Sequence, residues 1–301
     1  MQPEKVIDFH AHFPAAQNPP RRAIHPHILA YSQKLRERWR REYGFPEPEK
    51  EHPGNDKQAE RWAAEVTKNG LEKIVFMTGG NNETLAAVVR HYPQYFRGFA
   101  HHNLCEPGAV EKLVSALDEL GLSGYKWFGP LTAVPFESPE LKPFWSVLAE
   151  RRAPVLIHFG VLGGPGGTVW HPRISPLSLV PVAQAFPEIP FVIPHFGAGY
   201  YQDLLHLAWS SPNIYIDTSG SNDWMRWCPY PLTLKDLFAK ALDTVGPERI
   251  IFGTDSAWFP RGWSKIYYEQ QVAACNDLGL TKKEMNLIFY ANAKRLLDHR
   301  P

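Results

Sequence analysis

The feature that most constrains this chain is a regular alternation of short apolar runs with amphipathic segments. Eight apolar runs occur, at residues 5–12, 73–78, 96–102, 122–128, 154–159, 191–196, 213–218 and 249–254. Several are almost continuously apolar, as strands buried on both faces should be. The segments between them have helical spacing, with apolar residues three and four positions apart at Val110, Leu113, Val114 and Leu117. This alternation predicts parallel strands joined by right-handed crossovers.

Eight such units are the content of a (β/α)8 TIM barrel, which needs about 250 residues. The chain has 301 residues, so a barrel leaves room for an insertion. We therefore expect the α/β class, with an open doubly wound sheet as the alternative. Helices are expected at 56–69, 83–91, 109–120, 139–151, 177–186, 232–245, 264–278 and 282–297. No composition break marks a linker, so we expect a single domain over residues 1–301.

Residues 13–55 do not fit the alternation and are predicted to be an insertion after the first strand. The segment begins rich in proline and continues into a basic amphipathic stretch at 31–43. Loops this long in a compact domain are usually functional or disordered. Two interpretations remain equal: an excursion that packs on the side of the barrel, or a lid or subunit contact.

Charge and cysteine content exclude several classes of protein. The 32 Lys and Arg against 31 Asp and Glu give a formal charge of +1, which argues against nucleic-acid and membrane-surface partners. No run approaches the length of a membrane span. Cys105, Cys228 and Cys275 lie far apart, outside any CxxC pattern, which disfavours a disulfide framework and a thiolate zinc site. With no signal-peptide pattern at the start, we expect a cytoplasmic protein.

Polar residues with metal-binding chemistry stand at the ends of four predicted strands. The first strand ends in His10 and His12, which point to the same face because they are two residues apart. The fifth, sixth and eighth strands end in His158, His195 and Asp255. The carboxyl ends of barrel strands meet at one mouth, so these side chains should converge there.

Imidazole and carboxylate are good ligands for zinc and similar divalent ions. Each residue alone has an ordinary explanation, since a single His in a strand most often packs in the core and a buried Asp is most often a cap. Their joint placement after buried runs favours a metal site. Pro194 supports a position of His195 at the strand edge, because proline is excluded from the middle of a sheet.

The pattern Asp8-Phe9-His10-Ala11-His12, together with His158, His195 and Asp255, resembles the amidohydrolase superfamily. The segments FVIPHFGAG (191–199), IFGTDSAW (251–258) and FYANAKRL (289–296) are similar to its amidohydrolase-related branch, which includes aminocarboxymuconate-semialdehyde decarboxylase-like proteins. The resemblance implies a distorted barrel with one divalent metal, zinc or alternatively manganese. It implies the ligands His10, His12, His158 and Asp255, with His195 as proton shuttle and Asp255 as a further proton acceptor.

Three residues are candidates for binding the substrate. Lys126 lies near the place where some superfamily members carry a carboxylated lysine between two metals. We favour a cation facing a substrate carboxylate over a carboxylated metal ligand, and a structural ion pair is an equal alternative. Arg261 follows the eighth strand and is suited to a bidentate carboxylate contact, although a surface role is an equal competitor. Trp127 is expected near the mouth, where it suits a flat substrate, unless it packs in the core.

These observations lead to one expected function and two alternatives. We expect a hydrolase in which metal-activated water attacks an ester, lactone or amide of a small anionic substrate. The first alternative is a metal-dependent non-oxidative decarboxylase of an aromatic or unsaturated acid. The second is a non-catalytic ligand-binding barrel. A homodimer is the expected oligomer, on base rates alone.

Overall fold

The computed structural model describes residues 1–16 and 25–298, and its centre is a set of parallel strands in sequence order. One sheet holds β1 (Ile7–His12), β2 (Lys73–Thr78) and β3 (Phe96–Gly98). The other holds β4 (Tyr125–Phe128), β5 (Val155–His158), β6 (Phe191–Ile193), β7 (Ile214–Asp217) and β8 (Ile250–Ile251). Parallel bridges join the two sheets at both seams, from Ala100 to Tyr125 and from Ala11 to Ser256. This order of eight parallel strands confirms the predicted TIM-barrel fold class.

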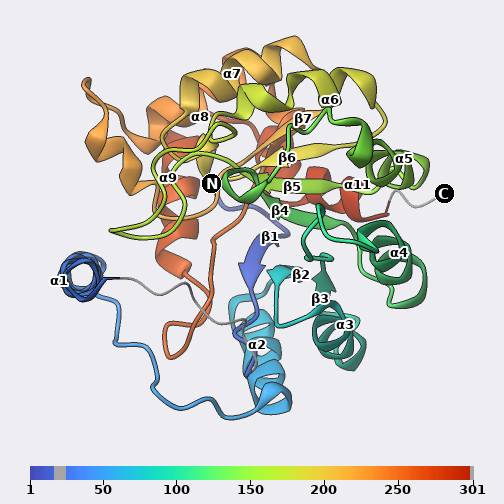
Figure 1. Ribbon diagram of the computed structural model, residues 1–301. Coiled ribbons are helices and arrows are strands. Elements are labelled where there is room, and N and C mark those ends of the chain that lie inside the picture. Colours follow the sequence, from blue (N-terminus) through green and yellow to red (C-terminus); the bar gives the residue numbers. More distant parts are fainter. Residues whose placement is uncertain (17–24, 299–301) are drawn as a thin grey trace.

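Helices surround the strands, as the alternation predicted (Figure 1). Those that follow the barrel strands are α2 (Asn55–Asn69), α3 (Asn82–His91), α4 (Ala109–Val114), α5 (Lys142–Glu150), α6 (Val180–Ala185), α7 (Tyr201–Ser210) and α8 (Leu234–Val245). The chain ends with α9 (Lys265–Asp277), α10 (Lys282–Asn286) and α11 (Asn292–Asp298). Helix α7 was not predicted from the sequence. None of the described helices has the length and apolar content to cross a membrane.

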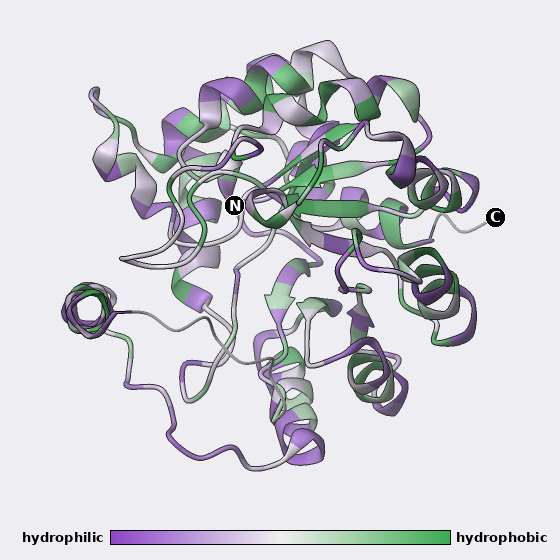
Figure 2. Ribbon diagram, viewed as in Figure 1, coloured by the Kyte–Doolittle hydropathy of each residue, from purple (hydrophilic) through white to green (hydrophobic). Residues whose placement is uncertain are grey.

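Two apolar layers hold the barrel together. Inward-facing residues such as Phe9, Met77 and Phe99 form an inner cluster, and Leu296 of α11 packs against it. The side chain of Asn292 donates to the Ile250 carbonyl at the start of β8, so α11 covers the amino end of the barrel. A larger apolar layer fills the space between strands and helices. Figure 2 shows the same division, with apolar strands and polar outer faces on the helices. Polar residues are left for the carboxyl end.

A bulge in β1 determines which way its histidines face. The pairing of β1 with β2 shifts register between Asp8 and Ala11 and again before His12. Phe9 therefore lies in the inner cluster while Ala11, two residues later, lies in the outer layer. An extra residue in a strand re-aims the side chains beyond it. His10 and His12 are thereby turned toward the centre of the barrel mouth.

The predicted insertion contains a helix, α1 (Pro26–Tyr43), that lies outside the ring of barrel helices (Figure 1). Ser32 is the one buried residue of α1. The end of α1 is tied to the loop after β7, where the Tyr43 hydroxyl donates to Asp223 over 3.0 Å and Glu42 pairs with Arg226 at 2.7 Å. Residues 17–24 of the predicted insertion lie outside the described part of the chain.

Candidate metal centre

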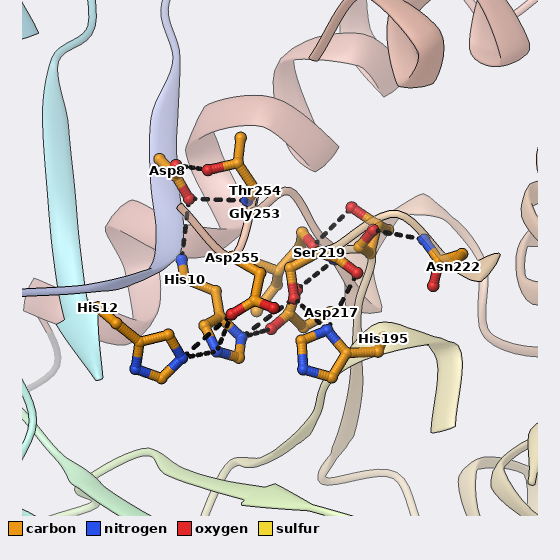
Figure 3. A network of polar contacts seen from close by, with 12 residues as sticks. Asp8, His10, His12, His195, Asp217, Ser219, Asn222, Gly253, Thr254 and Asp255 are labelled. Carbon is orange, nitrogen blue, oxygen red and sulfur yellow. Dashed lines mark hydrogen bonds and ion pairs between the residues drawn. The ribbon is translucent and has the colours of Figure 1, made fainter. Parts of the chain in front are cut away.

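His10, His12 and Asp255 bring three potential metal-binding atoms to one point at the carboxyl end of the barrel (Figure 3). The Nε2 atoms of His10 and His12 are 3.2 Å apart. Oδ1 of Asp255 lies 3.1 Å from Nε2 of His12 and 3.7 Å from Nε2 of His10. Ligands at about 2.0–2.1 Å from a tetrahedral zinc ion stand roughly 3.3 Å from one another. The donor set therefore fits a divalent metal in both atom type and spacing.

The outer nitrogens of the two β1 histidines are held by neighbouring strands. Nδ1 of His10 lies 2.6 Å from Oδ2 of Asp217, at the end of β7. Nδ1 of His12 lies 2.7 Å from the hydroxyl of Thr78, at the end of β2. An ionised carboxylate only accepts, so Nδ1 of His10 carries the proton and Nε2 keeps its lone pair. This arrangement leaves Nε2 of His10 free for a metal, and the Thr78 hydroxyl, which can donate or accept, is compatible with the same tautomer in His12.

His195 lies beside this group, in a 3₁₀ turn that starts directly after Pro194 and β6. Its Nδ1 is 3.0 Å from the carbonyl oxygen of Ser219, which can only accept a hydrogen bond. Nδ1 therefore donates and Nε2 is a free base. One ligand atom from each of His10, His195 and Asp255 falls within 4.8 Å of the others. His195 and Asp255 both have φ of 57°, a left-handed conformation that is rare outside glycine and frequent at functional sites.

His158 ends β5, and its ring centroid is 5.0 Å from that of His195. Its Nε2 is 2.9 Å from the carbonyl oxygen of Val161 and donates to it. The structure therefore does not bring Nε2 of His158 to the point where His10, His12 and Asp255 meet. Nδ1 is the nitrogen of His158 that remains for a ligand.

Burial sets the charge of the imidazoles. It lowers the pKa of His10 and His158 well below the ordinary range, and it lowers the pKa of His195 to about 4. Burial also raises the pKa of Asp217 to about 6. The three histidines are consequently neutral near pH 7, which is the form that binds a metal or accepts a proton.

Lys126 projects from β4 and is 1% exposed. Burial lowers the pKa of its ammonium group to about 7, against the opposing attraction of Asp255 and Asp217. The ammonium lies 4.6 Å from the ring centroid of Phe128. Within the described part of the chain, no carboxylate lies within ion-pair distance of it.

The other two predicted substrate contacts have partners within the protein. Arg261 donates from Nη2 to the backbone carbonyl of Asp255 at 3.3 Å, and its guanidinium lies over the ring of Trp258 at 4.9 Å. Trp127 is 8% exposed in the outer apolar layer, and its indole N–H donates to Thr132 over 2.8 Å. Successive residues of a strand face opposite sides, so Trp127 points away from the side of Lys126. The structure does not bring Trp127 to the histidines.

Sequence reasoning missed the residues that orient the histidines. Asp217 and Thr78 each end a barrel strand, by the same criterion that identified His158 and His195. Asp8 belongs to the motif at the end of β1, but the sequence assigned it no role. It accepts hydrogen bonds from the backbone N–H groups of His10 and Thr254, both at 3.0 Å, and so joins β1 to the chain after β8.

Comparison with known proteins defines the class. The sequence model of the amidohydrolase family matches residues 7–298 of this chain. The chain therefore belongs to this family, whose members are metal-dependent hydrolases and carboxy-lyases. The predicted superfamily is confirmed. No curated protein matches the sequence.

Solved structures share the fold at low sequence identity. An uncharacterised TIM-barrel protein from Bordetella bronchiseptica has a TM-score of 0.66 and 23% identity, covering 98% of this chain and 99% of that one. A probable 2-pyrone-4,6-dicarboxylic acid hydrolase from Acinetobacter baumannii has a TM-score of 0.64 and 17% identity, with 97% and 99% covered. A manganese-bound 5-carboxyvanillate decarboxylase from Novosphingobium aromaticivorans has a TM-score of 0.63 and 14% identity, with 97% of each covered. These likenesses support the TIM-barrel fold.

Proposed function

We propose that this protein is a metal-dependent hydrolase that cleaves an ester, lactone or amide bond of a small carboxylated substrate. The observation that carries the proposal is the free Nε2 of His195 beside the carboxylate of Asp255 and the His10–His12 pair. Hydrolysis needs a base to take a proton from the attacking water. His195 and Asp255 are both bases in the arrangement described above.

His10, His12 and Asp255 would hold one divalent ion, with His158 contributing through Nδ1. When bound, the ion supplies a Lewis acid that polarises a substrate oxygen and makes water easier to deprotonate. Nitrogen and oxygen donors at these spacings suit zinc, which we assign. Manganese is the alternative, supported by the manganese in the decarboxylase of the same fold.

The chain's own residues would move the proton. His195 accepts it from the attacking water at Nε2, while the Ser219 carbonyl holds Nδ1–H and keeps the ring in place. The same imidazole then returns the proton to the leaving group. Asp255 is the second acceptor.

The substrate carboxylate would be attracted by Lys126, a buried ammonium with a ring contact and, among the described residues, no carboxylate within ion-pair distance. Arg261 is a second cation close to Asp255. The hydrolase of the same fold is named for a dicarboxylic acid, which supports an anionic substrate. Trp127 is left out of the proposed site because it packs between the strands and the helices.

Decarboxylation is the second candidate, and Lys126 is the observation that favours it. A buried ammonium whose pKa is lowered to about 7 could deliver a proton to carbon as CO₂ leaves. The manganese-bound protein of the same fold is a decarboxylase, which supports this alternative.

A substrate panel separates the two reactions. Purified zinc-loaded protein would be incubated with carboxylated lactones, esters and amides and with a set of hydroxybenzoates. Cleavage without CO₂ supports the hydrolase, whereas CO₂ release from hydroxybenzoates without cleavage overturns it. The double variant His10→Ala/His12→Ala serves as control, since activity of the proposed site should vanish with it. Ligand binding without turnover across the panel would favour the non-catalytic barrel.

Three further expectations belong to this proposal. We infer a single domain in which the insertion at 13–55 acts as a lid. Its support is the ring of Phe45, which lies 6.4 Å from that of Trp258, a few residues after Asp255. We also infer a homodimer in the cytoplasm, on the grounds given by the sequence.

A further inference from the structure

We propose that Asp217 and Ser219, at the end of β7, are positioning residues that fix the tautomers of His10 and His195. They keep both Nδ1 atoms protonated, so that both Nε2 lone pairs face the same point. The inference rests on the metal centre of the proposed function. It adds the contacts that orient two histidines from different strands toward that centre.

The first half of the device is the contact between Asp217 and His10. Oδ2 of Asp217 lies 2.6 Å from Nδ1 of His10, and neither residue is exposed to solvent. The other carboxylate oxygen of Asp217 accepts the backbone N–H of Ser219 at 2.8 Å, which holds the carboxylate in place. A hydrogen bond to a carboxylate is shorter and stronger than a neutral one, and burial strengthens it further. The proton of a neutral His10 is therefore held at Nδ1.

The second half of the device is Ser219, which lies between the two imidazoles. Its hydroxyl oxygen is 3.1 Å from Nδ1 of His10 and 3.0 Å from Nδ1 of His195. Its carbonyl oxygen is also 3.0 Å from Nδ1 of His195. Nδ1 of His195 thus faces two oxygens of one residue, and the carbonyl can only accept. The proton of His195 is held at Nδ1 by the same turn.

Two glycines, Gly220 and Gly253, allow Asp217 and Ser219 to lie within hydrogen-bond distance of the histidines. A Cβ on Gly253 would lie 3.0 Å from Oδ1 of Asp217 and 3.0 Å from Cβ of Ser219. A Cβ on Gly220, where φ is 84°, would lie 3.2 Å from Nδ1 of His195. Real Cβ atoms rarely come so near, so a side chain at either position would push the turn away from the rings.

The consequence is a site prepared before any metal arrives. A neutral imidazole carries one proton, and a metal can bind only the nitrogen without it. Partners on the far nitrogen fix the tautomer and orient the ring, and removing such a partner typically weakens metal affinity by about 10–100-fold.

The test compares Asp217→Asn and Ser219→Ala with the unaltered protein. Zinc affinity is measured by competition with a chromophoric chelator. The tautomers are read from imidazole ¹⁵N shifts of the metal-free protein by NMR. Asp217→Asn should weaken zinc binding about 10–100-fold and shift His10 away from the Nδ1–H form. Ser219→Ala removes the hydroxyl but keeps the carbonyl that accepts from Nδ1 of His195, so it should leave His195 in the Nδ1–H form and weaken zinc binding less than Asp217→Asn does.

The control is Asp223→Asn, which removes a carboxylate from the same β7–α8 segment, where it contacts Tyr43 instead of the histidines. It should change neither readout. Wild-type zinc affinity and unchanged His10 ¹⁵N shifts in Asp217→Asn would overturn the proposal, as would an Nε2–H form of His10 or His195 in the unaltered protein. If Asp217→Asn does not fold, the ¹⁵N shifts of His10 and His195 in the unaltered protein decide the outcome. Failure of the unaltered protein to bind zinc would contradict the proposed function. The ¹⁵N shifts would still test the tautomers of His10 and His195 in that case.

Discussion

Gly253 is the position where adding one carbon atom tests the geometry of the site most sharply. In Gly253→Ala the new Cβ would lie 2.8 Å from Cβ of His10. Carbon atoms pack at about 3.5–4.0 Å, so the two groups must separate by roughly 0.7 Å. If His10 moves away from Asp217 by that amount, the distance between Nδ1 and Oδ2 rises from 2.6 Å to more than about 3.2 Å, the ordinary limit for such a hydrogen bond.

The expected result has two parts. Overpacking a filled site costs about 1–3 kcal/mol of stability, which urea denaturation of the metal-free protein measures. Zinc affinity should fall by about tenfold or more, because His10 loses the partner that orients it. Competition with a chelator measures the second part independently of turnover.

Gly98→Ala provides the matched control. A Cβ on Gly98 would lie 3.0 Å from Cγ of Leu85 and 3.1 Å from Cδ2 of Leu122, in the apolar layer. This variant should lose a similar amount of stability and keep wild-type zinc affinity. The reasoning is refuted if Gly253→Ala is destabilised like Gly98→Ala and binds zinc as tightly as the unaltered protein.

Other predictions follow from the site and from the packing of Trp127. Asp255→Asn should lower turnover by about 10²–10⁴-fold while circular dichroism shows the native secondary structure; an unchanged rate would remove Asp255 from the mechanism. Lys126→Met should raise KM for an anionic substrate about tenfold or more without lowering Tm, because it removes a buried cation along with the anion contact. The pKa of His195 is lowered to about 4, so the rate should fall as the pH drops through that value and Nε2 becomes protonated. In the metal-free protein, urea denaturation should show stability falling as the pH decreases from 6.5 to about 4, since the unfolded chain binds a proton that the native imidazole does not. Trp127→Phe should cost about 1 kcal/mol by losing its bond to Thr132 and leave KM unchanged; a large rise in KM would return Trp127 to the substrate site.

The order of the barrel elements could be predicted because buried strands and amphipathic helices leave different periods in the sequence. The position of His195 could also be predicted, since β6 ends at Ile193 and Pro194 stops the pairing. Helix α7 was missed although its buried residues Tyr201, Leu204 and Ala208 stand at helical spacing, so the periodic signal was present in the sequence.

The orientation of side chains was harder to predict than their place in the chain. The bulge in β1 has no signature in the sequence IDFHAH, yet it turns His10 and His12 inward. The contact between His10 and Asp217 joins residues 207 positions apart, so pattern reasoning could not reach it. Trp127 shows the opposite case. Successive side chains of β4 point to opposite faces, so this rule alone predicts that Trp127 and Lys126 do not share one site.

The central claim is that His10, His12 and Asp255 form a centre for one divalent metal. The most direct measurement is the metal content of protein purified without added chelator, by mass spectrometry, with His10→Ala/His12→Ala as the comparison. The account predicts about one equivalent of zinc in the unaltered protein, lost in the double variant and on chelation, with a lower Tm after removal. Less than about a tenth of an equivalent, with Tm unchanged by chelation or by added zinc, would contradict it.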